Sequence, residues 1–124
     1  MRIFGKSKAG LFALGRLKTG ERNRTEQAYE NVLKTMLISG EILWYSFDSI
    51  KLRLANNTFL SVDFFILTKD FKLQAVDVKG SLAIITDDAK VKMKVAAEKF
   101  PWEFFYAIPK PKREGGGFML VEIV

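Results

Sequence analysis

Residues 60–79 read LSVDFFILTKDFKLQAVDVK and carry the strongest signal of the fold. Two apolar runs flank a short polar turn, a pattern typical of two strands joined as a hairpin. Asp63 interrupts the first run, and Asp77 and Lys79 stand near the end of the second. Because strand side chains alternate between the two faces of a sheet, Asp77 and Lys79 are expected to point the same way.

The polar turn, at about 69–71, sets which residues of the two strands oppose each other. Directly opposed residues share a face and lie about 5 Å apart. Two carboxylates and an ammonium group are therefore expected to converge, and like charges this close inside a sheet are costly unless a cation joins them. The pattern predicts a divalent metal, and a metal beside a lysine indicates phosphodiester chemistry. The expected opposed pairs are Leu67 with Leu73, Phe65 with Ala75, Asp63 with Asp77, and Ser61 with Lys79.

The composition indicates one folded domain. A chain of 124 residues is large enough for one hydrophobic core, and its 48% hydrophobic and 13% aromatic residues exclude an intrinsically disordered protein. No apolar run approaches the ~20 residues that a membrane-spanning helix needs. The apolar run at 11–14 is too short for a signal peptide. The sequence therefore predicts a cytoplasmic protein that does not insert into a membrane.

The absence of cysteine and histidine restricts the chemistry that this chain can perform. Disulfides, zinc fingers, cysteine nucleophiles and Ser-His-Asp triads are excluded. Catalysis would have to use carboxylates, lysines, hydroxyls or a metal, and the available metal ligands are oxygens, which suit Mg²⁺, Mn²⁺ or Ca²⁺. The net charge of +6 favours a polyanionic partner, nucleic acid before a membrane surface.

We divide the chain into a basic arm, residues 1–22, and a single domain, residues 23–124. The arm is rich in lysine, arginine and glycine and shows little periodicity. Basic residues near the boundary are candidates for holding nucleic-acid phosphates: Lys18, Arg22 and Arg24.

The remaining patterns predict helices on both faces of a sheet. A helix is expected over residues 24–39, with Gly40 as its C-cap. A second is expected from an N-cap at Thr86 to about Phe100, because Pro101 follows. The predicted fold class is α/β (α+β), with a central mixed sheet flanked by helices. Besides the hairpin, strand-like runs are expected at 42–45, 50–54, 104–108 and 118–124.

Glu26 is a further candidate acid, and two interpretations of it stay open. It lies in the first turn of the predicted helix, along the edge of the apolar stripe, so it could join the two aspartates. It also completes the sequence NRTE at 23–26, a capping-box pattern in which its side chain would only cap the helix. Glu30, one turn further on, is the alternative acid on the same helix.

The second predicted helix carries lysines that could line a phosphate track: Lys90, Lys92 and Lys94. Lys90 and Lys94 are four residues apart and share one helix face. The alternative interpretation of these lysines is an ordinary solvated face.

The spacing of Asp63, thirteen further residues, and then Asp77-Val78-Lys79 resembles the PD-(D/E)xK nuclease superfamily. The proline that usually precedes the first aspartate is Val62 here, a departure that does not touch the chemistry. Flanking segments are similar to a family of small phage-encoded PD-(D/E)xK proteins, over roughly residues 16–108. Those segments are TEQAY (25–29), GEI (40–42), IKLRLA (50–55) and DDAKVKMKVAAE (87–98).

The resemblance implies a restriction-endonuclease-like core of α-β-β-β-α-β order. It also implies a Mg²⁺- or Mn²⁺-dependent endonuclease that hydrolyses DNA phosphodiester bonds. In such an enzyme Asp63, Asp77 and the backbone carbonyl of Val78 would hold the metal. Glu26 would complete that site or help to hold a second ion, and Lys79 would position the attacking water.

Branched DNA is an expected substrate, because small phage members of the superfamily include Holliday junction resolvases. Cutting both strands with one site per chain implies a homodimer. Two alternatives stay open: a non-catalytic basic DNA-binding protein that keeps the nuclease fold, and a nuclease directed at RNA. No element for reading a 2′-hydroxyl is identifiable in the sequence, so DNA and RNA are not separated.

Overall fold

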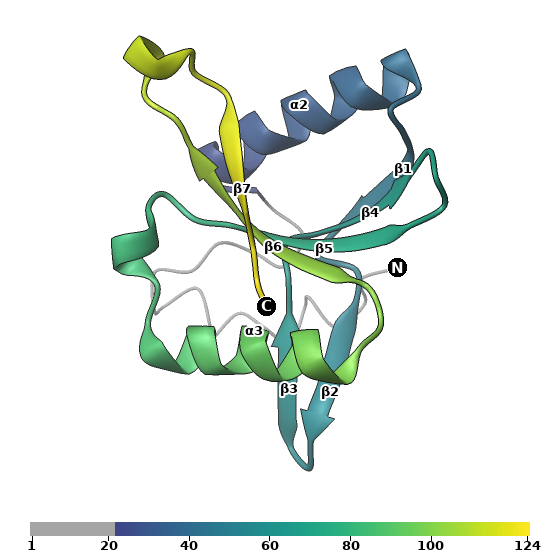
Figure 1. The fold of residues 1–124 in the computed structure, drawn as a ribbon, viewed down its shortest axis with the longest axis vertical. Helices are drawn as coiled ribbons and strands as arrows, with labels where there is room; N and C mark the ends of the chain where they lie inside the picture. Colours follow the sequence, from purple (N-terminus) through teal and green to yellow (C-terminus); the bar gives the residue numbers. More distant parts are fainter. Residues whose placement is uncertain (1–21) are drawn as a thin grey trace.

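The computed structural model describes residues 22–124. A five-stranded mixed sheet forms its centre, in the order β1-β4-β5-β6-β7, and β2 pairs with β3 in a separate hairpin (Figure 1). The fold is mixed α+β, as the sequence predicts. Its elements are α2 (Arg24–Ser39), β1 (Ile42–Phe47), β2 (Lys51–Ala55), β3 (Thr58–Ser61), β4 (Phe64–Thr68), β5 (Leu73–Val78), the 3-10 helix η2 (Leu82–Ile84), α3 (Asp87–Lys99), β6 (Glu103–Pro109), the 3-10 helix η3 (Lys112–Glu114) and β7 (Phe118–Glu122).

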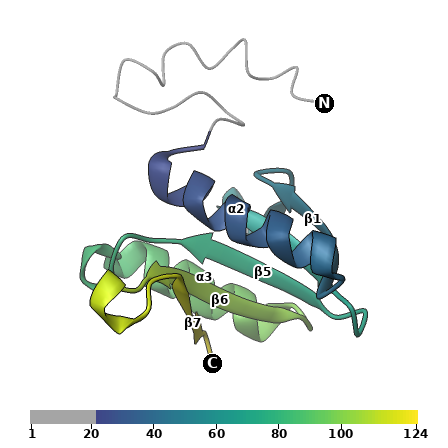
Figure 2. The ribbon, with the colours of Figure 1, turned by 90° about the horizontal axis from the view of Figure 1, so that it is seen from above.

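Helices α2 and α3 cover opposite faces of the five-stranded sheet, so its central strands are buried on both sides (Figure 2). This confirms the two-sided burial predicted for the hairpin strands. None of the helices in residues 22–124 is long and apolar enough to cross a membrane. The α2 face buries Tyr29, Leu33, Phe64, Ile66 and Val76, and the α3 face buries Phe65, Ala75, Met93, Ala96 and Phe104.

Local bonds set the ends of both helices. Asn23 Oδ1 accepts a hydrogen bond from the N–H of Glu26 at 2.8 Å. Gly40 ends α2 with a φ of 84°, a left-handed conformation that glycine adopts without steric cost. Thr86 caps α3 by accepting a bond from the N–H of Ala89 at 3.2 Å. The predicted extents of both helices are confirmed, α3 to within one residue.

Strands β4 and β5 form the predicted hairpin in the predicted register. Leu67 pairs with Leu73, and Phe65 pairs with Ala75. Phe71 takes a positive φ of 62° in the turn between the strands. The turn at the tip therefore sets the pairing along this part of the hairpin, as the sequence indicates.

The prediction that residues 60–67 form one strand is wrong. Ser61 belongs to β3 and pairs with Lys51 of β2, so the expected pair of Ser61 with Lys79 does not form. The β2–β3 hairpin leaves the main sheet because the apolar side of β2, including Leu52, is buried in the core that α3 covers. The apolar run 60–67 therefore contributes to two sheets: residues 60–61 belong to β3, and residues 64–67 belong to β4.

The connection from β5 through α3 to β6 determines which strand ends lie together at one edge of the sheet. Strands β5 and β6 are parallel, whereas β4 is antiparallel to β5. The carboxyl ends of β5 and β6 and the amino end of β4 therefore lie at the same edge. Strand β1 starts at the opposite edge, where α2 ends, so the amino end of α2 returns to this edge as well.

Candidate metal and catalytic site

Asp63 and Asp77 lie at this edge on neighbouring strands. The last paired residues of the β4–β5 ladder are Phe64 and Val76, so the two aspartates stand one position beyond it. Their charges act directly on one another, because the carboxylate of Asp77 raises the pKa of Asp63. The convergence of the two carboxylates, predicted from the hairpin register, is present in the structure.

Val78 links the two aspartates through its backbone. Its N–H donates a hydrogen bond to Asp63 Oδ2 at 2.8 Å, so a side chain takes the position of the missing strand partner. In an antiparallel ladder the N–H and C=O of one residue point toward the same neighbouring strand. The Val78 carbonyl is therefore directed to the side on which Asp63 stands.

Asp63 is a carboxyl group that resists ionisation. Burial raises its pKa most, and the negative charges of Asp77 and Glu26 raise it further, from the ordinary 3.8 to about 9. The bond from the Val78 N–H opposes this change, but it is outweighed. At neutral pH the isolated chain therefore holds a proton on Asp63 that a bound cation would displace.

Lys79 contributes the cationic group of the site. Its Nζ lies 3.3 Å from Asp77 Oδ2, and the two side chains are 32% and 15% exposed. The predicted common orientation of the two side chains is confirmed by this contact. Because Lys79 remains partly open to solvent, its ammonium group can reach a ligand while still in contact with Asp77.

Glu26 forms the helix cap that the sequence allowed, and it also interacts with Asp63. Its Oε1 accepts a hydrogen bond from the N–H of Asn23 at 2.9 Å, which completes a capping box at the start of α2. The same side chain hydrogen-bonds Asp63, and its charge raises the pKa of that group. The first turn of α2 therefore places a third negative charge near Asp63.

Glu30 has a different role from Glu26. It is 6% exposed, accepts a hydrogen bond from Tyr45 Oη at 2.7 Å, and forms an ion pair with Arg22. Burial opposes the ionisation of Glu30, but the bonds from Tyr45 and Arg22 and the nearby positive charges prevail and lower its pKa. The Arg22 guanidinium also lies 4.4 Å from the ring centroid of Phe47. Arg22, a predicted phosphate ligand, is thus engaged within the domain.

The other predicted phosphate ligands lie in different places. Lys90, Lys92 and Lys94 are all exposed on α3. Lys90 and Lys94 line a hollow of about 390 Å³, and Lys92 does not. Arg24 is exposed in the first turn of α2. Lys18 lies outside the described residues.

The donor set at the sheet edge suits a hard divalent cation. Mg²⁺ is held in proteins by one or two carboxylates and keeps several water molecules, so Asp63, Asp77 and the Val78 carbonyl match its preference. Within residues 22–124, no three acidic side chains are gathered closely enough to form a complete metal cluster by themselves. The fit therefore depends on two aspartates, one carbonyl and water.

Tyr106 is the neighbour of this site that sequence reasoning missed. It pairs with Asp77 across the parallel strands β5 and β6, and the charge of Asp77 contributes to a raised pKa of its hydroxyl, after burial. Alternation within 104–108 could place Tyr106 on a buried face. Its position beside Asp77 depends on a pairing between strands that are far apart in the sequence.

No family model matches this chain, and neither a curated protein nor a solved structure matches it. The geometry of the described residues is therefore the evidence on which a function can be argued.

Proposed function

We propose that this protein is a divalent-metal-dependent endonuclease that hydrolyses DNA phosphodiester bonds. One observation carries the proposal: Asp63 and Asp77 converge at adjacent strand ends, with Lys79 in contact with Asp77. A partly buried pair of carboxylates is unfavourable without a cation, and a lysine beside a divalent metal is suited to stabilising a reacting phosphate.

The order of the elements supports a restriction-endonuclease-like core. Helix α2, strands β1, β4 and β5, helix α3 and strand β6 follow one another as α-β-β-β-α-β, with the β2–β3 hairpin as an insertion between β1 and β4. Asp63 directly precedes the second strand of this series, and Asp77 lies on the third. The likeness of order and position favours a nuclease over an unrelated metal-binding domain.

The metal in this proposal is Mg²⁺ or Mn²⁺, held by Asp63, Asp77 and the Val78 carbonyl. Glu26 would complete that site or help to hold a second ion. When bound, the metal supplies Lewis acidity toward the phosphate and lowers the pKa of bound water. The side chains of the protein would orient the attacking water and stabilise the charge on the phosphate.

Lys79 is the group that acts on the substrate. Its ammonium donates hydrogen bonds to the water that attacks and to the non-bridging oxygens of the phosphate, where negative charge increases in the transition state. Asp77 holds this ammonium in place through the 3.3 Å contact. Asp63 keeps the two strand ends together through its bond to Val78, so the geometry is set before substrate arrives.

The basic surface supplies the attraction to DNA. The chain carries a net charge of +6, and Lys90, Lys92 and Lys94, exposed on α3, can bind backbone phosphates. In this proposal the substrate is duplex or branched DNA, the working unit is a homodimer because each chain carries one site, and the protein acts in the cytoplasm of a phage-infected host.

The decisive experiment is cleavage of a labelled panel of linear duplex, single strand, flap and four-way junction. Each substrate is incubated with Mg²⁺, Mn²⁺ or EDTA. Asp77→Asn and Lys79→Ala are each expected to lower the rate by about 10²-fold or more. Asp70→Asn is the matched control, because this exposed carboxylate stands in the turn at the other end of the same hairpin.

Cleavage in both metals, lost in EDTA and in the two site variants but kept in Asp70→Asn, supports the nuclease. The same panel made of RNA separates the two nucleic acids as substrates. Salt-sensitive binding without cleavage, unchanged by either site substitution, would instead identify a non-catalytic basic DNA-binding protein.

A further inference from the structure

A row of paired residues leads from the proposed catalytic site into the α3 side of the molecule. Asp77 of β5 pairs with Tyr106 of β6, and Tyr106 pairs with Val121 of β7. Paired residues on adjacent strands share a face and lie about 5 Å apart. Tyr106 therefore stands beside Asp77, and Val121 continues the row.

Within the described part of the chain, the hydroxyl of Tyr106 is buried without a hydrogen-bond partner. The residue is 6% exposed, and its Oη makes no hydrogen bond within residues 22–124. Burial and the charge of Asp77 both raise the pKa of this hydroxyl, so it remains a protonated donor. Buried polar groups in native proteins are nearly always hydrogen-bonded, so an unpaired hydroxyl beside a cavity is a candidate donor to a bound ligand or to an ordered water molecule.

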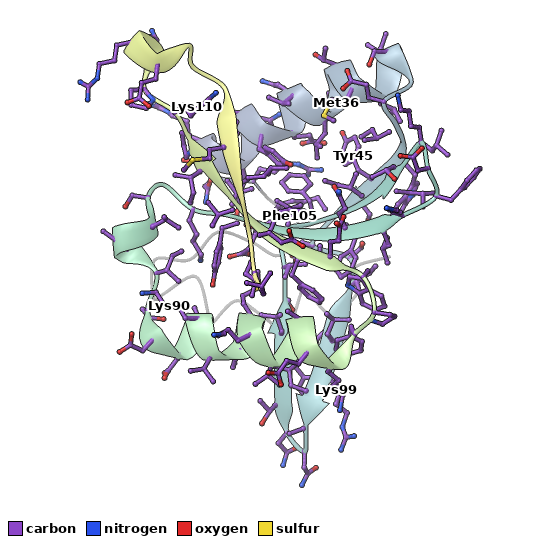
Figure 3. The ribbon with its side chains drawn as sticks, in the orientation of Figure 1. Met36, Tyr45, Lys90, Lys99, Phe105 and Lys110 are labelled. Carbon is purple, nitrogen blue, oxygen red and sulfur yellow. The ribbon has the colours of Figure 1, made fainter. Side chains whose placement is uncertain are left out.

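The Tyr106 side chain lines a hollow of about 390 Å³ between α3, η2 and β7. Figure 1 shows β7 descending toward α3, and Figure 3 shows Lys90 near the start of that helix. The walls combine apolar side chains with two exposed lysines: Leu82, Val121 and Ile123 are apolar, and Lys90 and Lys94 are basic. Glu122 also borders the hollow, but its side chain alternates to the opposite face from Val121 and Ile123.

We propose that this hollow binds one unpaired nucleotide of the nucleic-acid substrate. The base enters between the apolar walls and hydrogen-bonds the Tyr106 hydroxyl, and Lys90 and Lys94 hold the adjoining phosphates. A cavity of this size falls in the range of small-molecule sites, about 300–1,000 Å³. Apolar walls with lysines at the rim match the two parts of a nucleotide, its flat base and its phosphate.

The position of the hollow gives this site a role in choosing substrates. Tyr106 lines the hollow and pairs with Asp77, so a nucleotide in the hollow would lie near the proposed catalytic site. The role in choosing substrates therefore rests on the proposed nuclease function. A base inside a duplex is stacked and paired, so it must be extruded at a cost before it can enter. A nucleotide that is already unpaired, at a flap, bulge or junction, enters without that cost. The hollow therefore favours branched or single-stranded substrates over intact duplex.

The test compares binding of two matched DNA molecules in EDTA, where cleavage does not occur. One is a fully paired duplex, and the other has the same sequence with one added unpaired nucleotide; fluorescence anisotropy gives each Kd. The full-length protein is expected to bind the second about tenfold more tightly, the effect of burying one base. Leu82→Trp, which fills the hollow from a half-exposed position, should abolish this preference.

Two further variants isolate the hydroxyl and the charge. Tyr106→Phe keeps the ring and its packing, and it should reduce the preference by about threefold to tenfold through loss of one hydrogen bond. Lys90→Ala should weaken binding to both DNA molecules. Lys99→Ala is the matched control for charge, because it removes a lysine from the other end of α3 (Figure 3) and should leave the preference intact.

Equal affinity of the wild-type protein for both DNA molecules would overturn the inference, as would a preference that survives Leu82→Trp. The outcome is separate from that of the cleavage assay. A preference in EDTA without cleavage in Mg²⁺ refutes the nuclease and keeps the hollow as a nucleotide site. Cleavage in Mg²⁺ without a binding preference in EDTA supports the nuclease and refutes the nucleotide site.

Discussion

The carboxylate of Asp63 accepts a hydrogen bond from the backbone N–H of Val78 at 2.8 Å, just beyond the last pair of the β4–β5 ladder, Phe64 with Val76. The chain arrives here from the β2–β3 hairpin and joins the main sheet only at Phe64, so the Val78 N–H has no strand partner on β4. The side chain of Asp63 replaces that partner and thereby holds itself beside Asp77. The same bond that completes the sheet edge thus builds the candidate metal site.

We expect the metal-free protein to lose stability as the pH rises from about 4 to about 9. The unfolded chain loses the Asp63 proton near 3.8, whereas the folded protein keeps it until about 9. Between these values the folded state binds more protons, so the free energy of unfolding falls by up to about 1.4 kcal/mol per pH unit. Urea unfolding in EDTA at several pH values measures this slope. It should be reduced in Asp63→Asn, and an equal slope in both proteins contradicts the prediction.

Mg²⁺ or Mn²⁺ should raise the Tm, and more so at about pH 8 than at about pH 6. Metal binding must displace the proton on Asp63, so affinity increases as the pH approaches the pKa of that group. Differential scanning fluorimetry with increasing metal measures the effect. Asp77→Asn should lose the shift and Asp70→Asn should keep it; a shift of equal size in both would place the metal elsewhere.

Lys79→Ala should separate catalysis from metal binding. Removing the ammonium takes away stabilisation of the phosphate, and we expect the cleavage rate to fall by about 10²–10³-fold. The metal-induced rise in Tm should persist, because both aspartates remain. Lys79→Arg keeps the charge in a different shape and should retain part of the activity. Loss of the metal-induced shift in Lys79→Ala would show instead that this residue is needed to build the site.

Glu26→Gln should distinguish the capping role of Glu26 from its role beside Asp63. Glutamine also completes a capping box, so the metal-free Tm should not fall, and removing a negative charge near Asp63 favours the fold. The metal-induced rise in Tm should be smaller than in the wild type. Asn23→Ala is the comparison for capping alone and should cost about 1 kcal/mol of stability. An unchanged metal response in Glu26→Gln would leave Glu26 as a cap only.

The side chain of Glu30 is expected to stabilise the folded protein. Truncating Glu30 leaves the partly buried Arg22 guanidinium without its carboxylate, and Glu30→Ala is expected to cost about 2 kcal/mol. Tyr45→Phe, which removes one bond to Glu30, should cost about 1 kcal/mol. Since the pKa of Glu30 is lowered from 4.5, its contribution is present above that value and is lost as the pH falls below it. Urea unfolding of both variants, with acid titrations, measures these effects; a wild-type free energy of unfolding in Glu30→Ala would refute the assignment.

Helices, turns and the β4–β5 register could be predicted from the sequence because their causes are local. Asn23 and Thr86 cap helices through residues three positions away, and Gly40 ends a helix by its own backbone freedom. The tip of the hairpin sets the pairs Leu67 with Leu73 and Phe65 with Ala75. The convergence of Asp63 and Asp77 follows from that register, and the contact of Lys79 with Asp77 follows from strand alternation, so three of the four candidate site residues were placed by sequence alone.

Other features depended on contacts between distant segments. The break within residues 60–67 arises because β2 buries its apolar side in the core under α3, and an apolar run does not reveal which core it will join. Glu26 contacts Asp63 only because α2 packs across the sheet, and Tyr106 meets Asp77 only because α3 returns the chain to a parallel strand. Capping and turn formation act over a few residues, whereas the choice between apolar faces is made by the packed molecule as a whole.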